Sequence, residues 1–188
     1  MEFFNLNENS ILVSWNVELN SSLTSLISSY KNEILSLCKD DIKDCVQSIK
    51  SILIIIDLKR TSINEIIEKI KMIDYEKINN HDRTIKVWEI PVCYDLEFAT
   101  DINLLSDIKN LSVRDIIDAH LSKTYDVLSM GFLPGFMYLG KTDKKLHCER
   151  KEKPSLNIRK GSIGLALDQT CIYPRQSPGG WHIIGNSP

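Results

Sequence analysis

The sequence lacks an apolar stretch long enough to cross a membrane. Its longest apolar run, residues 52–56, is far shorter than the roughly 20 residues that a transmembrane helix needs. It also lacks a strong excess of charge of either sign, because its formal net charge is −2. The first residues, MEFFN, have neither the basic segment nor the apolar core of a signal peptide. We therefore expect no membrane partner, no nucleic-acid partner and a cytoplasmic location.

Cysteine pairs with a recognisable spacing are also missing. The five cysteines form no C-x-x-C pair and no zinc-site spacing: Cys38, Cys45, Cys93, Cys148 and Cys171. The pattern indicates reduced thiols in a cytosolic protein and no metal site. What the chain does have is a 43% apolar share in 188 residues, which is enough for a packed core in one or two domains.

The first half of the chain predicts an α+β domain. Strand patterns occupy residues 11–15, 42–48, 51–57 and 84–92. Two helices separate them. The first follows the helical spacing of Leu23, Leu26, Ile27, Tyr30 and Ile34. The second opens with a capping box, and its apolar stripe is Ile63, Ile66, Ile67, Ile70 and Ile73. The capping residues are Ser62 and Glu65. The order β-α-β-β-α-β is typical of a split βαβ, ferredoxin-like domain.

The strand at residues 51–57 is apolar on both of its faces. Ile52, Ile54 and Ile56 lie on one face, and Leu53 and Ile55 on the other. An antiparallel sheet with one face in water would alternate apolar and polar residues. The pattern therefore predicts that the second face is covered by another domain or by a partner.

The second half begins after an expected hinge at residues 93–101. A short helix is expected within residues 100–109, and Ser112 with Asp115 forms a capping box for the next helix. A strand pattern follows at residues 125–130. In residues 161–167 apolar side chains occupy one face and small ones the other, and a face of small side chains allows close approach of a ligand or another backbone.

Glycine and proline punctuate the last third in ordered blocks: GFLPGFMYLG at 131–140, GSIGLALDQTCIYP at 161–174 and SPGGWHIIGNSP at 177–188. Such residues shape the loops between strands, where binding sites often lie. The blocks resemble the allophanate hydrolase subunit 1 family, which includes the B subunit of bacterial 5-oxoprolinase, the KipI antikinase and a segment of urea carboxylase. The resemblance implies a cyclophilin-like β-barrel over residues 93–188, C-terminally incomplete, after an α+β domain over residues 1–92.

The resemblance also implies a function. It implies the B subunit of an ATP-dependent 5-oxoprolinase, which opens 5-oxo-L-proline to L-glutamate with subunits A and C and is inactive alone. ATP would be used by the complex rather than bound by this chain. The alternatives are a KipI-like inhibitor of a sensor histidine kinase, and a relative of urea carboxylase and allophanate hydrolase.

Candidate site residues come from the same blocks and from the preceding helix. The two candidate catalytic residues are His120 and His182. Candidate substrate-binding residues are Arg150, Gly161, Ser162, Gln169, Thr170, Tyr173, Gly179, Gly180 and Trp181. His120 also fits a hydrogen-bonded core histidine, because it lies on an apolar helical stripe. Arg150 fits either a carboxylate clamp or a solvated charge run.

One further pattern is G-x-x-x-x-G-K-T at residues 135–142, which matches a phosphate-binding P-loop. Bulky residues fill its middle, and no helical stripe follows it. We interpret the match as coincidence; a true P-loop nucleotide binder is the alternative, and it requires a helix after Lys141.

Overall fold

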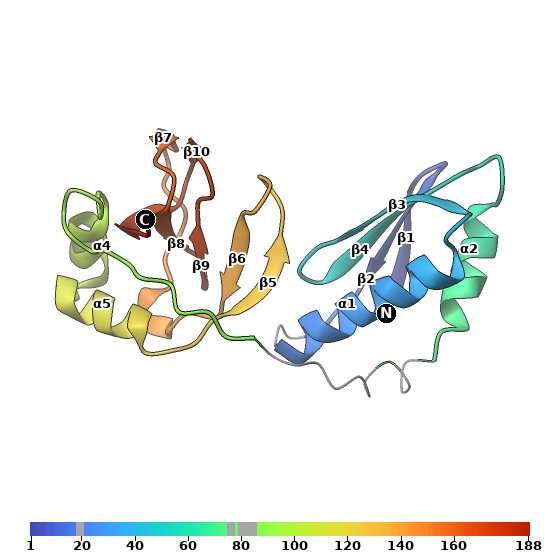
Figure 1. The fold of residues 1–188 in the computed structure, drawn as a ribbon, viewed down its shortest axis with the longest axis horizontal. Helices are drawn as coiled ribbons and strands as arrows, with labels where there is room; N and C mark the ends of the chain where they lie inside the picture. Colours follow the sequence, from blue (N-terminus) through green and yellow to red (C-terminus); the bar gives the residue numbers. More distant parts are fainter. Residues whose placement is uncertain (18–20, 75–77, 79–85) are drawn as a thin grey trace. The chain divides into compact units, whose positions relative to one another are not determined.

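The computed structural model describes residues 1–17, 21–74, 78 and 86–188 (Figure 1). The chain divides into two compact units, residues 1–85 and 86–188. Each unit combines helices with antiparallel sheet, which confirms the predicted mixed α/β character. The predicted domain boundary between residues 92 and 93 stays a prediction.

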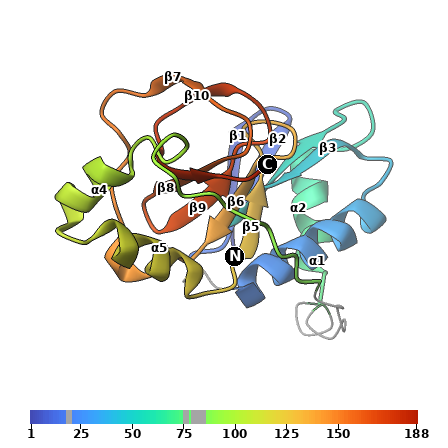
Figure 2. The same cartoon turned by 60° about the vertical axis from the view of Figure 1, so that its left-hand side comes forward.

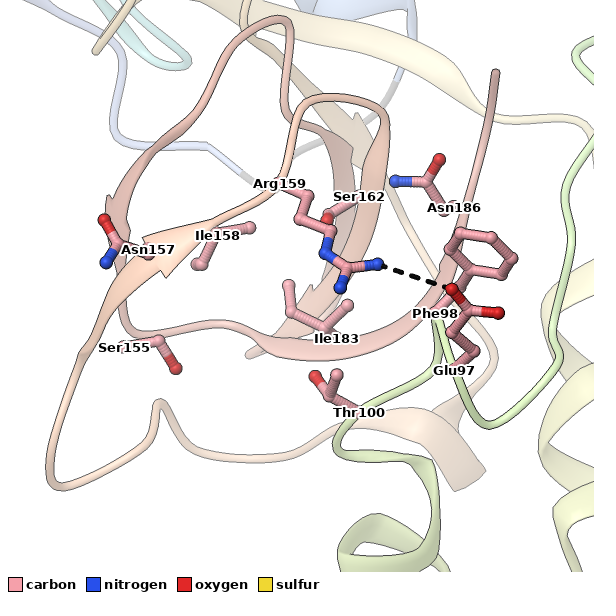
Figure 3. A pocket seen from close by; sticks show the side chains of 10 residues that line it. All are labelled: Glu97, Phe98, Thr100, Ser155, Asn157, Ile158, Arg159, Ser162, Ile183 and Asn186. Carbon is pink, nitrogen blue, oxygen red and sulfur yellow. Dashed lines mark ion pairs between the residues drawn. The ribbon is translucent and has the colours of Figure 1, made fainter.

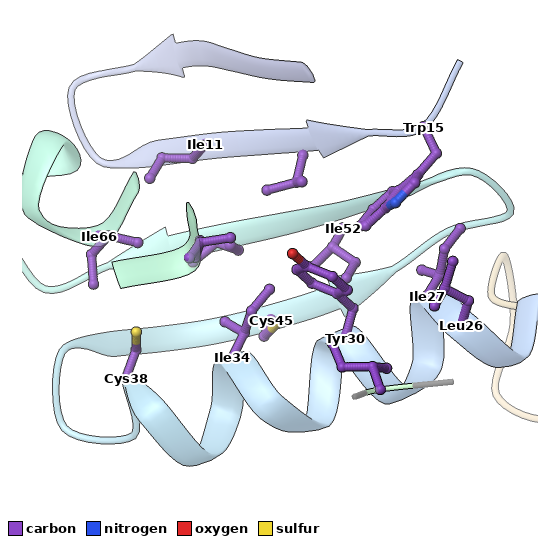
Figure 4. Packing of buried hydrophobic residues seen from close by; sticks show 14 of the residues in the cluster. Ile11, Trp15, Leu26, Ile27, Tyr30, Ile34, Cys38, Cys45, Ile52 and Ile66 are labelled. Atoms are coloured by element: carbon purple, nitrogen blue, oxygen red, sulfur yellow. The ribbon is translucent and has the colours of Figure 1, made fainter. Parts of the chain in front are cut away.

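The first unit is a four-stranded antiparallel sheet with helices on one face. Its strands are β1 (Glu2–Asn7), β2 (Ser10–Ser14), β3 (Ile42–Gln47) and β4 (Ser51–Ile56), in the order β1-β2-β4-β3. The helices are α1 (Ser21–Leu37) and α2 (Ile63–Lys71). The predicted stripes of both helices pack on Ile52, Ile54 and Ile56 of β4 (Figure 4). Burial of this apolar surface is the main contribution to the stability of the unit.

The start of α2 forms as its sequence predicts. The Ser62 side chain accepts a hydrogen bond from the Glu65 amide at 3.4 Å, and the Glu65 carboxylate accepts one from the Ser62 amide at 2.9 Å. These two bonds satisfy amide groups that have no partner within the helix. The hydrogen bonds also hold the pKa of Glu65 below its usual value.

The predicted strand at residues 84–92 is wrong for residues 86–92, which form no strand. Thr84 and Ile85 lie outside the described residues. The sheet position beside β2 is occupied instead by β1, a strand that the sequence analysis missed, with Phe4 opposite Leu12. A two-residue connection brings β1 onto β2, and such short connections favour pairing of neighbouring strands.

The outer face of this sheet carries a row of apolar residues across all four strands. Phe4, Leu12, Leu53 and Val46 are consecutive cross-strand partners. Phe4 and Val46, at the two edges, are 46% and 47% exposed, whereas Leu12 and Leu53 are half-buried. That another surface covers this row stays a prediction.

The second unit is built on a five-stranded antiparallel sheet in the order β11-β8-β9-β6-β5. Its strands are β5 (Asp126–Met130), β6 (Met137–Gly140), β8 (Ser162–Ala166), β9 (Gln169–Ile172) and β11 (His182–Asn186). A separate pair is formed by β7 (Ser155–Ile158) and β10 (Ser177–Gly179). The helices are α4 (Ile102–Lys109), α5 (Val113–Leu121) and the 3₁₀ turn η1 (Lys144–Leu146). The predicted capping box of Ser112 and Asp115 is present.

Two hydrophobic clusters lie on opposite faces of the five-stranded sheet. Ile163 and Leu165 pack with residues of α4 and α5 on one face, and the two helices lie along that side of the second unit (Figures 1 and 2). On the other face, the small residues of β8 meet aromatic rings: a side chain at Gly164 would lie 3.0 Å from Trp181 Cβ and 3.4 Å from Tyr173. The small-residue face of residues 161–167 is therefore filled at this point by the protein's own aromatic core.

Residues 93–101 do not form the expected hinge. Cys93 exchanges two backbone hydrogen bonds with Asn186, at 2.8 and 2.9 Å, and the Asp101 amide donates to the Ile183 carbonyl at 2.9 Å. The segment is therefore attached to β11 at both of its ends. This attachment brings residues 97–100 beside β7 and β8.

The cysteines are free thiols. Cys38 is buried in the core of the first unit and Cys171 in the aromatic core of the second. Burial raises the pKa of both thiols, because an apolar environment disfavours the thiolate.

Candidate functional site

A cavity of about 100 Å³ opens in the second unit (Figure 3). Its walls come from the segment at residues 97–100, from β7 and the turn that follows it, and from β8 and β11. The lining residues are Glu97, Phe98, Thr100, Ser155, Asn157, Ile158, Arg159, Ser162, Ile183 and Asn186. Small-molecule sites usually measure roughly 300–1,000 Å³, so this cavity suits only a small ligand.

Arg159 extends over the cavity toward Glu97 (Figure 3). One guanidinium nitrogen lies 4.0 Å from a Glu97 carboxylate oxygen, and the two side chains are 67% and 73% exposed. A separation of 4.0 Å is too long for a hydrogen bond. An ion pair this exposed is also worth at most about 1 kcal/mol. The guanidinium is therefore free to exchange Glu97 for another anion.

A nearly buried ion pair lies behind the cavity. Lys151 Nζ is 2.8 Å from Asp101 Oδ2, and their side chains are 12% and 16% exposed. The same ammonium donates to Ser155 Oγ at 2.7 Å, and Asp101 Oδ2 accepts the Ile183 amide at 2.7 Å. The pair thereby fixes two residues of the lining, Ser155 and Ile183. Because an ammonium group only donates, the Ser155 hydroxyl keeps its own proton for another acceptor.

His120 does not line this cavity; it is a buried residue of α5, and both of its ring nitrogens are hydrogen-bonded. Nδ1 is 2.7 Å from the Tyr94 hydroxyl and Nε2 is 3.0 Å from Thr170 Oγ1. Thr170 donates its hydroxyl proton to the Gly164 carbonyl, so it can only accept from Nε2–H. The neutral ring then accepts at Nδ1 from Tyr94. Burial lowers the pKa of His120 from 6.5 to about 4, because it removes water from the imidazolium form.

This buried histidine makes stability depend on pH. The unfolded chain binds the His120 proton more strongly than the folded chain, so protonation favours unfolding. We expect the free energy of unfolding to fall by about 3 kcal/mol as the pH is lowered from 6.5 to about 4. Urea unfolding at a series of pH values measures this change. The His120→Gln variant should lose this part of the slope while keeping the contribution of the carboxylates; an unchanged slope in the variant would contradict the assignment.

His182 is buried at the start of β11. Its Nε2–H donates to the Glu149 carbonyl at 3.0 Å, whereas Nδ1 has no partner among the described residues. Arg150 is exposed, and its Cβ lies 3.8 Å from the position that a side chain on Gly180 would take. His182, Arg150 and Gly180 therefore lie in or near the loop at residues 148–154. Nδ1 of His182 remains a hydrogen-bond acceptor without a partner among the described residues.

Tyr173 and Trp181 belong to the aromatic core around Phe136, with ring centroids 5.1 and 6.1 Å from that of Phe136. Gly179 lies against the Tyr173 hydroxyl, which leaves no space for a side chain. Burial raises the pKa of Tyr173. Gln169 is buried where β9 pairs with Gly140 and Ala166.

The predicted residues therefore lie in separate places. Ser162 lines the cavity and Gly161 precedes it, while the other predicted residues lie in the core or beside the 148–154 loop. Sequence reasoning missed Arg159, Glu97 and the Lys151–Asp101 pair. Arg159 stands two residues before Gly161, and that proximity to a glycine turn was the available signal. The roles predicted for the site residues stay predictions.

The helix that a P-loop requires after Lys141 does not form in the structure. β6 ends at Gly140, and the next element is the three-residue turn η1. In the described ranges no group of three or more His, Cys, Asp or Glu residues could hold a metal ion. Likewise, none of the described helices has the length and apolar character to span a membrane.

Comparison with known proteins gives a consistent set of relatives. A family model described as "Carboxyltransferase domain, subdomain C and D" matches residues 1–188. The chain is 28% identical over 193 residues to the 5-oxoprolinase B subunit of Bacillus subtilis (strain 168), covering 97% of this chain and 80% of that protein. It is 38% identical over 99 residues to the 5-oxoprolinase B subunit of Escherichia coli O157:H7, covering 53% of this chain but only 45% of that protein.

Solved structures with a similar fold include longer proteins. TTHA0988 matches with a TM-score of 0.80 and 24% identity, over 95% of this chain and 34% of that chain. The Kluyveromyces lactis urea amidolyase matches with a TM-score of 0.77 and 16% identity, over 98% of this chain and 13% of that chain. The uncharacterized protein PH0987 from Pyrococcus horikoshii is 32% identical, with a TM-score of 0.53, over 100% of this chain and 86% of that chain. The first two likenesses concern the fold alone.

Proposed function

The chain belongs to the family of carboxyltransferase domains, subdomain C and D, and from this membership we propose that it acts as the B subunit of an ATP-dependent 5-oxoprolinase. The observation that carries the proposal is the similarity to a protein named as the 5-oxoprolinase B subunit over 97% of this chain. The proposed reaction opens the lactam of 5-oxo-L-proline to give L-glutamate. The proposed partners are subunits A and C.

Hydrolysis of an unactivated lactam needs activation of its carbonyl. In the proposed reaction, ATP supplies this by phosphorylating the amide oxygen. Hydrogen-bond donors held in place by the protein then stabilise the anionic intermediate formed when water adds. We assign ATP binding to the partner subunits, because η1 follows Gly140 where a phosphate-binding helix would be needed.

The proposal gives this chain a binding and positioning role. Arg150, Gln169 and His182 are proposed to hold substrate, with Arg150 as the exposed member of the three and the buried His182 held by its bond to the Glu149 carbonyl. His120 is proposed to shape the site with the C subunit, because both of its ring nitrogens are used in holding Tyr94 and Thr170. We also propose the ferredoxin-like and cyclophilin-like assignments of the two units, and a cytoplasmic location.

Reconstitution tests this function. We expect the purified chain to form no glutamate from 5-oxo-L-proline and ATP. Co-expression with subunits A and C should give glutamate formation that depends on ATP, on 5-oxoproline and on this chain. A coupled glutamate assay measures the rate. Turnover by the chain alone, or equal turnover by subunits A and C without it, would refute the proposal.

A further inference from the structure

We propose that the cavity beside Arg159 is a binding site for a small carboxylate, with the Arg159 guanidinium as its clamp. That the natural ligand is 5-oxo-L-proline rests on the proposed function; in that case Arg159, in place of Arg150, clamps the substrate carboxylate. The site itself rests on the geometry of the second unit alone, because every residue that lines it belongs to that unit.

The charge of Arg159 is the first reason to expect an anionic ligand. Among the described residues that line the cavity, Arg159 carries the one positive charge. Its ion-pair partner in that lining, Glu97, is 4.0 Å away and 73% exposed. A guanidinium presents its donors as a planar fork that matches the two oxygens of a carboxylate. A ligand carboxylate can therefore replace Glu97 and gain two hydrogen bonds that Glu97 does not make.

The other polar groups also suit an anion. The Ser155 hydroxyl accepts from Lys151, so its proton is available to the cavity. Thr100, on the segment at residues 97–100, brings a second hydroxyl to the lining (Figure 3). The Lys151–Asp101 pair holds the first hydroxyl in place without losing its own partners. The Ser155 hydroxyl is thus positioned before any ligand arrives, which lowers the entropic cost of binding.

The volume and the apolar residues of the cavity limit the size and chemical nature of its ligand. The volume of about 100 Å³ lies well below the roughly 300–1,000 Å³ of usual small-molecule sites, so the ligand is smaller than a nucleotide. Ile158 and Ile183 supply apolar wall between the hydroxyls and the guanidinium (Figure 3). The fitting ligand is a small ring or short chain with one carboxylate and a few methylene groups.

Three probes with matched shapes test the site on the full chain. The first is 5-oxo-L-proline. The second, cyclopentanecarboxylate, has the carboxylate but no amide. The third, 2-pyrrolidinone, has the lactam but no carboxylate. Titrations followed by amide chemical shifts in NMR should give saturable shifts of residues 97–100 and 155–162 with both carboxylates. Binding of 2-pyrrolidinone should be at least about tenfold weaker, because it forms no charged hydrogen bonds.

Variants then identify the clamp. Arg159→Gln should weaken the binding of both carboxylates at least about tenfold and leave the binding of 2-pyrrolidinone unchanged. Glu97→Gln should strengthen carboxylate binding, because it removes the competing anion. The matched control is Arg175→Gln, which removes an exposed arginine outside the cavity and should change nothing. Because Arg159 is exposed, the melting temperature of its variant should equal that of the unmodified chain.

Three outcomes would overturn the inference: no carboxylate binding by the unmodified chain, equal binding of all three probes, or normal carboxylate binding by Arg159→Gln. The turnover of the reconstituted complex is a separate measurement. A complex whose KM for 5-oxoproline is unchanged by Arg159→Gln refutes 5-oxoproline as the natural ligand of the cavity but not the function. Carboxylate binding by a chain that supports no turnover refutes the function but not the site.

Discussion

Replacing Asp101 with Ala is expected to destabilise the second unit by about 3–5 kcal/mol, because the change leaves Lys151 as a nearly buried cation without its counter-charge. The Ile183 amide loses its acceptor at the same time. Urea unfolding of the full chain measures the effect. Amide hydrogen exchange of β8 and β11 during that unfolding reports on the second unit specifically.

Two further variants separate the ion pair from the packing around it. Asp101→Asn combined with Lys151→Met removes both charges but keeps an oxygen for the Ile183 amide, so it should cost less than Asp101→Ala. The matched surface control is Glu68→Ala, which breaks the Lys71–Glu68 pair of α2 at 2.8 Å, with side chains 53% and 63% exposed. That control should cost less than about 1 kcal/mol. An equally small cost for Asp101→Ala would mean that water reaches Lys151.

Replacing Gly161 with Ala is expected to destabilise the same unit by about 2–4 kcal/mol, from left-handed strain and from overlap. Gly161 has a φ of +80°, and an added Cβ would overlap the Ser187 carbonyl oxygen. The Gly161 carbonyl also accepts the Ser187 amide, and its own amide donates to Tyr173, each at 2.8 Å. The backbone therefore cannot move away from the new side chain without breaking these bonds.

Gly131 provides the matched control for this prediction. Nothing lies within 4 Å of a Cβ built on Gly131, so Gly131→Ala should change the melting temperature little. Gly161→Ala should also weaken carboxylate binding, because the adjacent Ser162 and Arg159 line the cavity. Equal melting temperatures for the two variants would contradict the conformation described for the 159–162 turn.

The sequence predicted those elements whose signals are local. The stripes of α1 and α2 and the capping boxes at Ser62 and Ser112 each depend on residues within about four positions of one another, as helix contacts do. Strand identity was less secure. Residues 84–92 have a strand-like composition, but β1 is the strand that pairs with β2. Which of two segments pairs with a given strand cannot be read from either segment alone.

The cavity was predictable only in part for the same reason. Ser162 was singled out because it belongs to the glycine-containing block at residues 161–174, and in the structure Gly161 has the positive φ of a turn. Asp101 and Lys151 are 50 residues apart, and Lys151 reads locally as one member of a solvated charge run. Their pairing, and the position of residues 97–100 beside β7, depend on the attachment of Cys93 and Asp101 to β11. Such long-range pairings carry no short sequence pattern.

Two of the three buried thiols can report separately on the two units of the molecule. Cys38 lies in the core of one unit and Cys171 in the core of the other. A thiol that is buried and held protonated reacts with an alkylating reagent only when its surroundings open. The rates at which the two peptides are alkylated, read by mass spectrometry, therefore give separate opening equilibria for the halves. Equal rates would mean that they open as one cooperative body, and different rates that each melts independently.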